Sequence, residues 1–126
     1  MPAPDSSSWT LIPVMYRDAS NFKAHGVILL EGIVTGAEIA TLRASLHEET
    51  YYVPRQLGLD HLATEKWPGS FYDDDHNWHE VCLSEISTVE LAMPALMRVE
   101  GTQDGGTVAD FISKVQKAAA DGWDPA

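Results

Sequence analysis

The sequence predicts an α+β fold: a small, mostly antiparallel sheet of three to four strands with two main helices packed on one face. Three observations predict it. Two segments have apolar residues at helical spacing, and each follows a threonine suited to capping. Several short segments are rich in the β-branched and aromatic residues typical of strands. The 126 residues, 44% of them hydrophobic, suffice for one core, and no apolar run approaches the roughly 18 residues of a membrane-spanning helix.

The first two strands are predicted over Trp9–Tyr16 and Gly26–Val34. We expect residues 1–8, which hold two prolines and three serines, to form a disordered tail before them. Pro13 has no N–H to donate to a neighbouring strand, so the first strand is expected at a sheet edge or bulged at that residue. An edge strand can pair with a second copy of itself, which would give a homodimer. Gly32 marks a bulge in the second strand.

The first helix is predicted over Gly36–His47. A capping box opens it, in which the Thr35 hydroxyl accepts from the Glu38 backbone N–H and the Glu38 carboxylate accepts from the Thr35 N–H. Apolar residues then follow at spacings of three and four, namely Ile39, Leu42 and Leu46.

The middle of the chain predicts shorter elements. Tyr51–Val53 forms a short strand that ends at a proline, and a short helix is expected over Asp60–Lys66. Trp78–Val89 is predicted as a strand. Its alternation of apolar and polar residues changes phase near Ser84–Ile86, which indicates a bulge there.

The C-terminal part predicts a second helix. Leu91–Val99 is apolar and fits either a strand or a helix, and the glycine-rich Glu100–Gly106 is expected to be a turn. Thr107 then caps a helix that Gly122 ends. Its apolar face comprises Val108, Phe111, Ile112, Val115 and Ala119. Residues 9–126 are therefore expected to form one α+β domain.

Acidic residues dominate the composition. Eight basic residues stand against nineteen acidic ones, for a formal net charge of −11. This balance argues against charge-driven binding to DNA or RNA, which needs clustered Lys and Arg. It favours either a well-solvated surface or a negative face that docks a protein partner with a basic surface. The N-terminus has no basic start and no apolar stretch of a secretory signal, so we expect a cytoplasmic protein without a membrane partner.

Cys82 is the single cysteine of the chain. It excludes an intramolecular disulfide and a zinc site made of several cysteines, and it fits the reducing cytosol. Within Val81-Cys82-Leu83 we expect a buried, unreactive thiol.

The most polar segment is Asp73–Glu80, with sequence DDDHNWHE. Three adjacent carboxylates repel one another unless water, a partner or a cation compensates them. The segment therefore fits a solvated loop or a protein-binding epitope, with nearby aromatic residues as the apolar anchors. The predicted partner-binding residues are Asp73, Asp74, Asp75, Trp78, Glu80, Glu85, Trp67, Tyr72 and Arg17.

The alternative is a metal-binding protein or a small metal-dependent enzyme that uses the same Asp73–Glu80 segment, with a divalent metal held by Asp75, His76 and His79. On an extended strand His76 and His79 would point to opposite faces, and the spacing matches neither a calcium loop nor a metalloprotease motif. No catalytic residue is predicted. The chain lacks the Gly-x-Ser-x-Gly, phosphate-loop and dinucleotide-binding patterns, so serine hydrolysis and nucleotide-dependent chemistry are unsupported.

Two runs of the chain carry a family resemblance. Met15–Lys23 (MYRDASNFK), followed by Gly26 and Glu31-Gly32, resembles a group of small acidic bacterial and phage-associated proteins of unassigned function, and Asp73–Glu80 resembles the second signature of that group. The resemblance implies that the two runs share one surface and that the protein acts in phage or mobile-element biology. With the charge, it favours a non-enzymatic acidic binding module, in concrete form an inhibitor or immunity-type protein without a cofactor.

Overall fold

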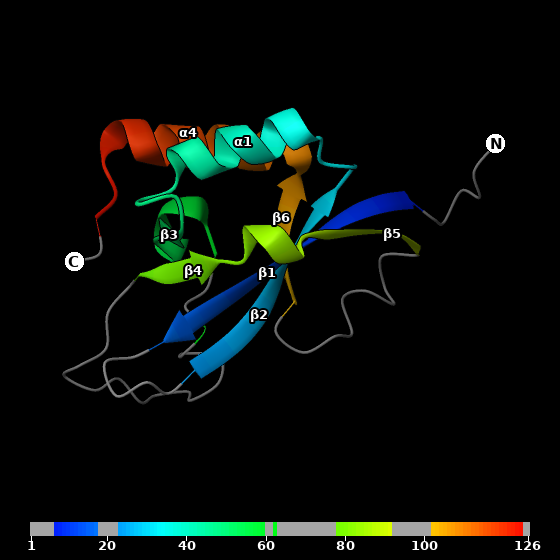
Figure 1. Cartoon of the computed structure of the whole chain (residues 1–126), viewed down its shortest axis with the longest axis horizontal. Coiled ribbons are helices and arrows are strands. Elements are labelled where there is room, and N and C mark those ends of the chain that lie inside the picture. Colours follow the sequence, from blue (N-terminus) through cyan, green and yellow to red (C-terminus); the bar gives the residue numbers. More distant parts are fainter. Residues whose placement is uncertain (1–6, 18–22, 60–61, 63–77, 92–101, 125–126) are drawn as a thin grey trace.

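The computed structural model describes residues 7–17, 23–59, 62, 78–91 and 102–124. It shows an α+β fold in which a six-stranded mixed sheet carries two helices on one face (Figure 1). The class is as predicted, but the sheet has more strands than three to four and contains one parallel pair. The elements, in order, are β1 (Ser7–Arg17), β2 (Lys23–Glu31), α1 (Gly36–Ser45), β3 (Tyr51–Tyr52), η1 (Pro54–Leu57), β4 (His79–Val81), η2 (Leu83–Glu85), β5 (Ser87–Leu91), β6 (Thr102–Thr107) and α4 (Val108–Asp121).

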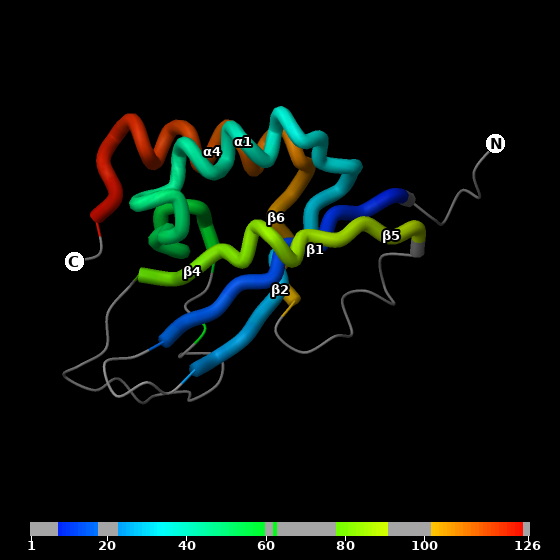
Figure 2. The backbone as a smooth tube through the Cα atoms, in the orientation of Figure 1, coloured from blue at the N-terminus to red at the C-terminus, as the bar shows by residue number. Residues whose placement is uncertain are grey.

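Strand β1 lies at the centre of the sheet, whose order is β3-β4-β1-β2-β6 with β5 also paired to β1. β2 runs antiparallel to it from Trp9–Glu31 to Arg17–Lys23. On its other side, β1 pairs with β4 and then with β5 (Figure 2). The predictions of an edge strand and of self-pairing through it are therefore wrong. The disordered tail was also predicted too long, since Ser7 and Ser8 already pair with β5.

Pro13 is accommodated in this central strand because its partner strand is interrupted there. β4 ends opposite Val14, and β5 resumes opposite Leu11. Between them the chain leaves the ladder as the 3₁₀ turn η2, and Cys82 donates its N–H to the Pro13 carbonyl at 2.9 Å. The backbone nitrogen of Pro13, which carries no hydrogen, faces this same side, at the gap between β4 and β5. The single strand predicted over Trp78–Val89, with a bulge near Ser84–Ile86, is therefore wrong in form: the segment makes two strands, β4 and β5, separated by a turn of 3₁₀ helix.

Strand β6 replaces the predicted turn over Glu100–Gly106. It runs parallel to β2, with Ile28 opposite Gln103, and a register shift follows at its glycines. A Cβ at Gly105 would lie 2.6 Å from the Leu30 side chain and 2.7 Å from that of Ile28, so the close approach of the two strands requires glycine. The glycine-rich composition favours a turn over a strand here, and pairing with β2 is what makes the segment a strand.

Both helices follow their predicted caps. The Thr35 hydroxyl accepts from the Glu38 N–H at 3.2 Å, and the Glu38 carboxylate accepts from the Thr35 N–H at 2.9 Å. Helix α1 ends at Ser45, two residues before the predicted end. Likewise β2 ends at Glu31, so that Gly32, with φ of 105°, lies in the connection to α1 rather than in a bulge of the strand. Helix α4 begins after Thr107 and ends before Gly122, as predicted.

The sheet has two faces. Even-numbered residues of β1 and β2 point toward the helices and are buried with them in one core. Odd-numbered residues lie on the opposite side, which no described helix covers and which we call the open face. One end of this face holds a small second cluster in which Trp9 and Leu29 are buried against Leu11 and Val89. The main core comprises Ile12, Val14, Tyr16, Ala24, Ile28, Leu30, Val34, Leu42, Leu46, Tyr52, Leu57, Leu62, Val108, Phe111, Val115 and Ala118.

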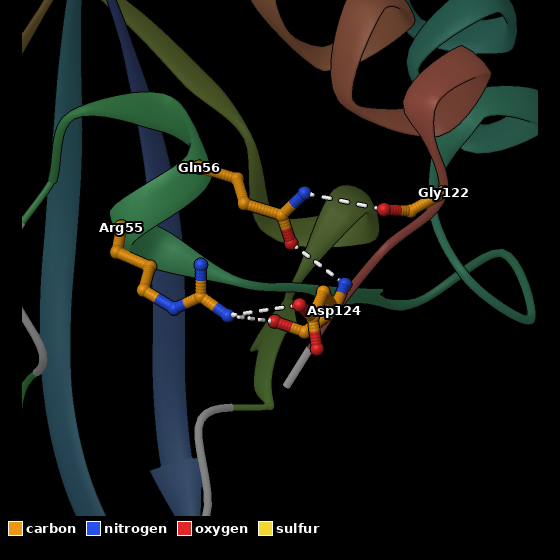
Figure 3. A network of polar contacts seen from close by, with 4 residues as sticks. All are labelled: Arg55, Gln56, Gly122 and Asp124. Carbon is orange, nitrogen blue, oxygen red and sulfur yellow. Dashed lines mark hydrogen bonds and ion pairs between the residues drawn. The ribbon is translucent and has the colours of Figure 1, made fainter. Parts of the chain in front are cut away.

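The segment after α4 ties the helical layer to η1 (Figure 3). Gln56 donates to the Gly122 carbonyl at 3.3 Å and accepts from the Asp124 N–H at 2.8 Å. Arg55 binds the carbonyl and the carboxylate of Asp124. The Trp123 indole N–H donates to the Ser45 carbonyl at 3.0 Å, which satisfies one of the orphan carbonyls at the end of α1.

Two predicted elements fall largely or wholly beyond the part of the chain that is described. They are the Asp60–Lys66 helix, of which Leu62 alone is described and is helical, and residues 92–99 of the apolar segment. Within the described ranges, neither helix has the length and apolar character needed to cross a membrane.

Candidate functional site

A row of side chains crosses four strands on the open face. Tyr51 of β3 is the register partner of Glu80 on β4, Glu80 is that of Met15 on β1, and Met15 is that of His25 on β2. Register partners on adjacent strands point to the same face. Trp78 precedes Glu80 by two residues, so its side chain points to the same face as these residues. We call Met15, His25, His47, Tyr51, Trp78 and Glu80 the open-face patch.

Three rings of this patch touch one another. The His47 imidazole stacks on the Trp78 indole, with centroids 4.6 Å apart and planes 23° apart. The Tyr51 ring meets Trp78 edge-on at 6.2 Å and 64°. Tyr51 and Trp78 are half-buried, and the His47 side chain is 48% exposed. The three rings therefore form a rigid aromatic surface that water still reaches.

A tight turn holds His47 in place. His47 and Tyr51 exchange both backbone hydrogen bonds at 2.9 Å, and Glu48 and Glu49 between them adopt left-handed conformations with φ of 51° and 62°. Such conformations cost non-glycine residues of order 1 kcal/mol each. The Glu48 carboxylate lies 3.9 Å from the His47 Nε2.

The charges next to the open-face patch differ between its two sides, while Glu31 and Asp104 lie elsewhere on the same face. Glu48, Glu49 and Glu80 lie toward β3 and β4. Arg17 and Lys23 are register partners at the ends of β1 and β2, both exposed, and His25 follows two residues after Lys23 on the same face. The patch thus runs from an acidic to a basic side across a centre of aromatic residues and methionine.

Under the patch, on the helix side of the sheet, His79 is fully buried. Its Nε2 accepts the Leu62 backbone N–H at 3.1 Å, so this nitrogen is unprotonated in the folded state. Its ring packs between those of Tyr16 and Tyr52, at centroid distances of 5.0 and 5.5 Å. These contacts make His79 a residue of the core that fixes the strand bearing Trp78 and Glu80.

Tyr52 carries the single buried side-chain polar atom that has no hydrogen-bond partner among the described residues, its hydroxyl. Burial, together with the nearby Cys82, raises the pKa of Tyr52 far above its ordinary value. Cys82 itself is half-buried, not buried as expected. Burial and then the Glu85 carboxylate raise the pKa of its thiol, which favours the protonated, unreactive form.

We expect Tyr52→Phe to stabilise the protein by about 1 kcal/mol at pH 7, because it removes a buried hydroxyl that gains no hydrogen bond on folding. The raised pKa also predicts an effect of alkali. The unfolded chain releases the Tyr52 proton near pH ~10 while the folded chain keeps it, so stability falls as the pH rises further. Tyr52→Phe should remove up to ~1.4 kcal/mol per pH unit of this slope.

Urea unfolding between pH 7 and pH 11.5 measures both effects. Tyr51→Phe, at a half-buried position one residue earlier, is the control and should change stability at pH 7 by less than about 0.5 kcal/mol. A loss of stability in Tyr52→Phe at pH 7 would show that the hydroxyl has a partner.

The structure places four predicted partner-binding residues. Trp78 and Glu80 belong to the open-face patch, Arg17 lies at its basic side, and Glu85 is exposed on η2. The prediction missed His47, Tyr51, Met15 and His25. The alternation along β1 was a signal for Met15, which stands two residues before Arg17. The other predicted residues, Asp73, Asp74, Asp75, Trp67 and Tyr72, lie outside the described residues.

The metal site stays a prediction, because Asp75 and His76 also lie outside the described residues. Of its three ligands His79 is described, and its Nε2 is already engaged by Leu62. Nowhere in the described ranges do three or more His, Cys, Asp or Glu side chains gather in a way that could hold a metal ion.

Comparisons with family models, with curated proteins and with solved structures find no match to this chain. The resemblance to phage-associated proteins therefore stays a prediction.

Proposed function

We propose that this protein is a non-enzymatic binding module that docks a protein partner with a basic surface through the open-face patch. The observation that carries the proposal is the half-buried aromatic surface of His47, Tyr51 and Trp78 on the sheet face opposite the helices. An inhibitor or immunity-type role in phage or mobile-element biology is the concrete form of the proposal.

The composition of the patch supports a protein partner. Aromatic residues, methionine and arginine are enriched at the centres of protein interfaces, and tryptophan and tyrosine dominate their binding energy. Trp78, Tyr51 and Met15 provide this centre, and Arg17 stands beside it. The core under the patch holds these strands by packing and by the His79 hydrogen bond, so little order has to be gained on binding.

The charge supports a basic partner. A net charge of −11 on 126 residues attracts positively charged proteins over distances of about a Debye length, ~8 Å at physiological salt. Such attraction raises association rates more than final affinity. We propose that Glu80 and Glu85 contribute to this field, together with Asp73, Asp74 and Asp75, and that Trp67 and Tyr72 extend the apolar contact.

Site-specific photo-crosslinking tests the location of the surface. A benzophenone side chain at Tyr51 should crosslink one predominant protein in a lysate of the source cells, and the same group at Lys114, exposed on α4, should not. Equal crosslinking from both positions would place the interface elsewhere and contradict the proposal.

With the captured partner purified, Trp78→Ala is expected to weaken binding at least ~10-fold, the range of an interface hot spot. Ile33→Ala, which removes another exposed apolar side chain, in the connection between β2 and α1, should leave the Kd within ~2-fold. The association rate should also fall as salt increases from 50 to 500 mM. Calorimetry and stopped-flow fluorescence measure these quantities, and a Kd unchanged in Trp78→Ala would refute the role of the patch.

A further inference from the structure

We infer that Glu80 is the binding position for an arginine side chain of the partner, with the guanidinium bonded to the Glu80 carboxylate and lying against the rings of the open-face patch. The inference rests on the proposed function and names the group that the patch recognises.

Glu80 differs from the other described carboxylates. All but two of these are on exposed residues; the exceptions are Glu38 and Glu80. Glu38 is engaged in the capping box of α1. Glu80 has neither a hydrogen bond nor an ion pair with any described residue. A half-buried carboxylate has lost part of its hydration, and here no cation of the described chain compensates it.

The neighbours of Glu80 suit a flat cation that donates hydrogen bonds at its edges and stacks through its weakly hydrated faces. Tyr51 and Met15 flank the carboxylate on the two adjacent strands, and Trp78 lies two residues before it on the same face. The Tyr51 and Trp78 rings stand at 64° to each other, so the aromatic residues that neighbour Glu80 on this face present two differently oriented surfaces. Aromatic rings attract cations through their electron-rich faces.

Arginine fits this arrangement better than lysine. Its planar guanidinium can donate two parallel hydrogen bonds to one carboxylate and stack on an aromatic ring at the same time. It is also less strongly hydrated than an ammonium group, so its transfer into a half-buried position costs less. The thioether of Met15 can pack along the alkyl part of the side chain.

The test uses the full chain and a probe of defined chemistry. Amide and indole NMR signals of the protein are followed during titration with N-acetyl-arginine amide, with the corresponding lysine and citrulline compounds as controls. We expect saturable shifts at the Glu80 amide and the Trp78 indole N–H. Binding of the arginine probe should be at least ~3-fold tighter than that of the lysine probe, and the uncharged citrulline probe should give no saturable shift.

Glu80→Gln should weaken binding of the arginine probe about 5-fold, the effect of losing one exposed or half-exposed ion pair. Glu31→Gln is the matched control, because it removes the same charge from an exposed residue on the same face, the last of β2, which forms no ion pair with any described residue. Melting curves of both variants check that the fold is retained.

Three results would overturn the inference: no saturable shift with the arginine probe, equal binding of arginine and lysine, or unchanged binding in Glu80→Gln. Each of them leaves the proposed function standing if a partner still crosslinks at Tyr51. Loss of that crosslink with intact arginine binding would instead refute the proposed function and leave Glu80 as a guanidinium-binding position without the proposed partner.

Discussion

Gly105→Ala is expected to destabilise the fold by about 2–3 kcal/mol, the range for adding a methyl group to a fully packed core. The new Cβ would lie 2.6 Å from the Leu30 Cδ2 and 2.7 Å from the Ile28 Cγ2. Both side chains are fully buried on β2, so neither can move away without displacing the helices. The parallel pairing of β6 with β2 should loosen as a result.

Gly36→Ala is the control for this substitution. No described atom lies within 4 Å of the place that a methyl group would take at Gly36, and alanine suits the first turn of α1. We expect it to be neutral or slightly stabilising. Urea unfolding at 25 °C measures both variants, and a loss below about 0.5 kcal/mol in Gly105→Ala would show that β6 does not approach β2 this closely.

Thr10→Val is expected to cost about 2–4 kcal/mol, because one buried and one half-buried backbone group lose their partner. The Thr10 hydroxyl is fully buried; it donates to the Gly32 carbonyl at 2.8 Å and accepts from the Val34 N–H at 3.1 Å. Valine keeps the shape of the side chain but leaves both backbone groups without this partner, and a buried group left unpaired costs about 1–3 kcal/mol, a half-buried one less. The connection from β2 to the capping box of α1 depends on these two bonds.

Two further variants separate the hydroxyl from the methyl group. Thr10→Ser keeps both hydrogen bonds and should recover most of the lost stability. Thr88→Val makes the same exchange at the exposed register partner on β5 and should stay within about 0.5 kcal/mol of the parent protein. A Thr10→Val protein as stable as the parent would mean that other groups can satisfy Gly32 and Val34.

The helices were predictable because their signals are local. The Thr35–Glu38 capping box and the apolar spacing of α4 lie within a few residues of the structure that they specify. β6 was not predictable in this way. Its sequence, TQDGGT, is poor in strand-forming residues, and what makes it a strand is contact with Ile28 and Leu30, more than 70 positions earlier in the chain.

The candidate site was predictable in part for the same reason. Charge and aromatic content pointed to Trp78 and Glu80, because these stand in the acidic C-terminal half. Tyr51, Met15 and His25 join them through the registers of β3, β1 and β2, and no spacing within the sequence encodes those registers. His47 reaches Trp78 through a turn of left-handed glutamates that residue preferences argue against.

The central position of β1 bears on how the chain folds during synthesis. β1 and β2 leave the ribosome first and can pair at once as a local hairpin, whereas the strands on the other side of β1 are encoded about 60 to 80 residues later. Until they arrive, that side of β1 is an open template for strands of other nascent chains. Pro13 lies in the middle of this unpaired side of β1 and has no N–H to offer another strand. The same proline that fits the gap between β4 and β5 in the folded sheet therefore opposes aggregation before those strands have been made.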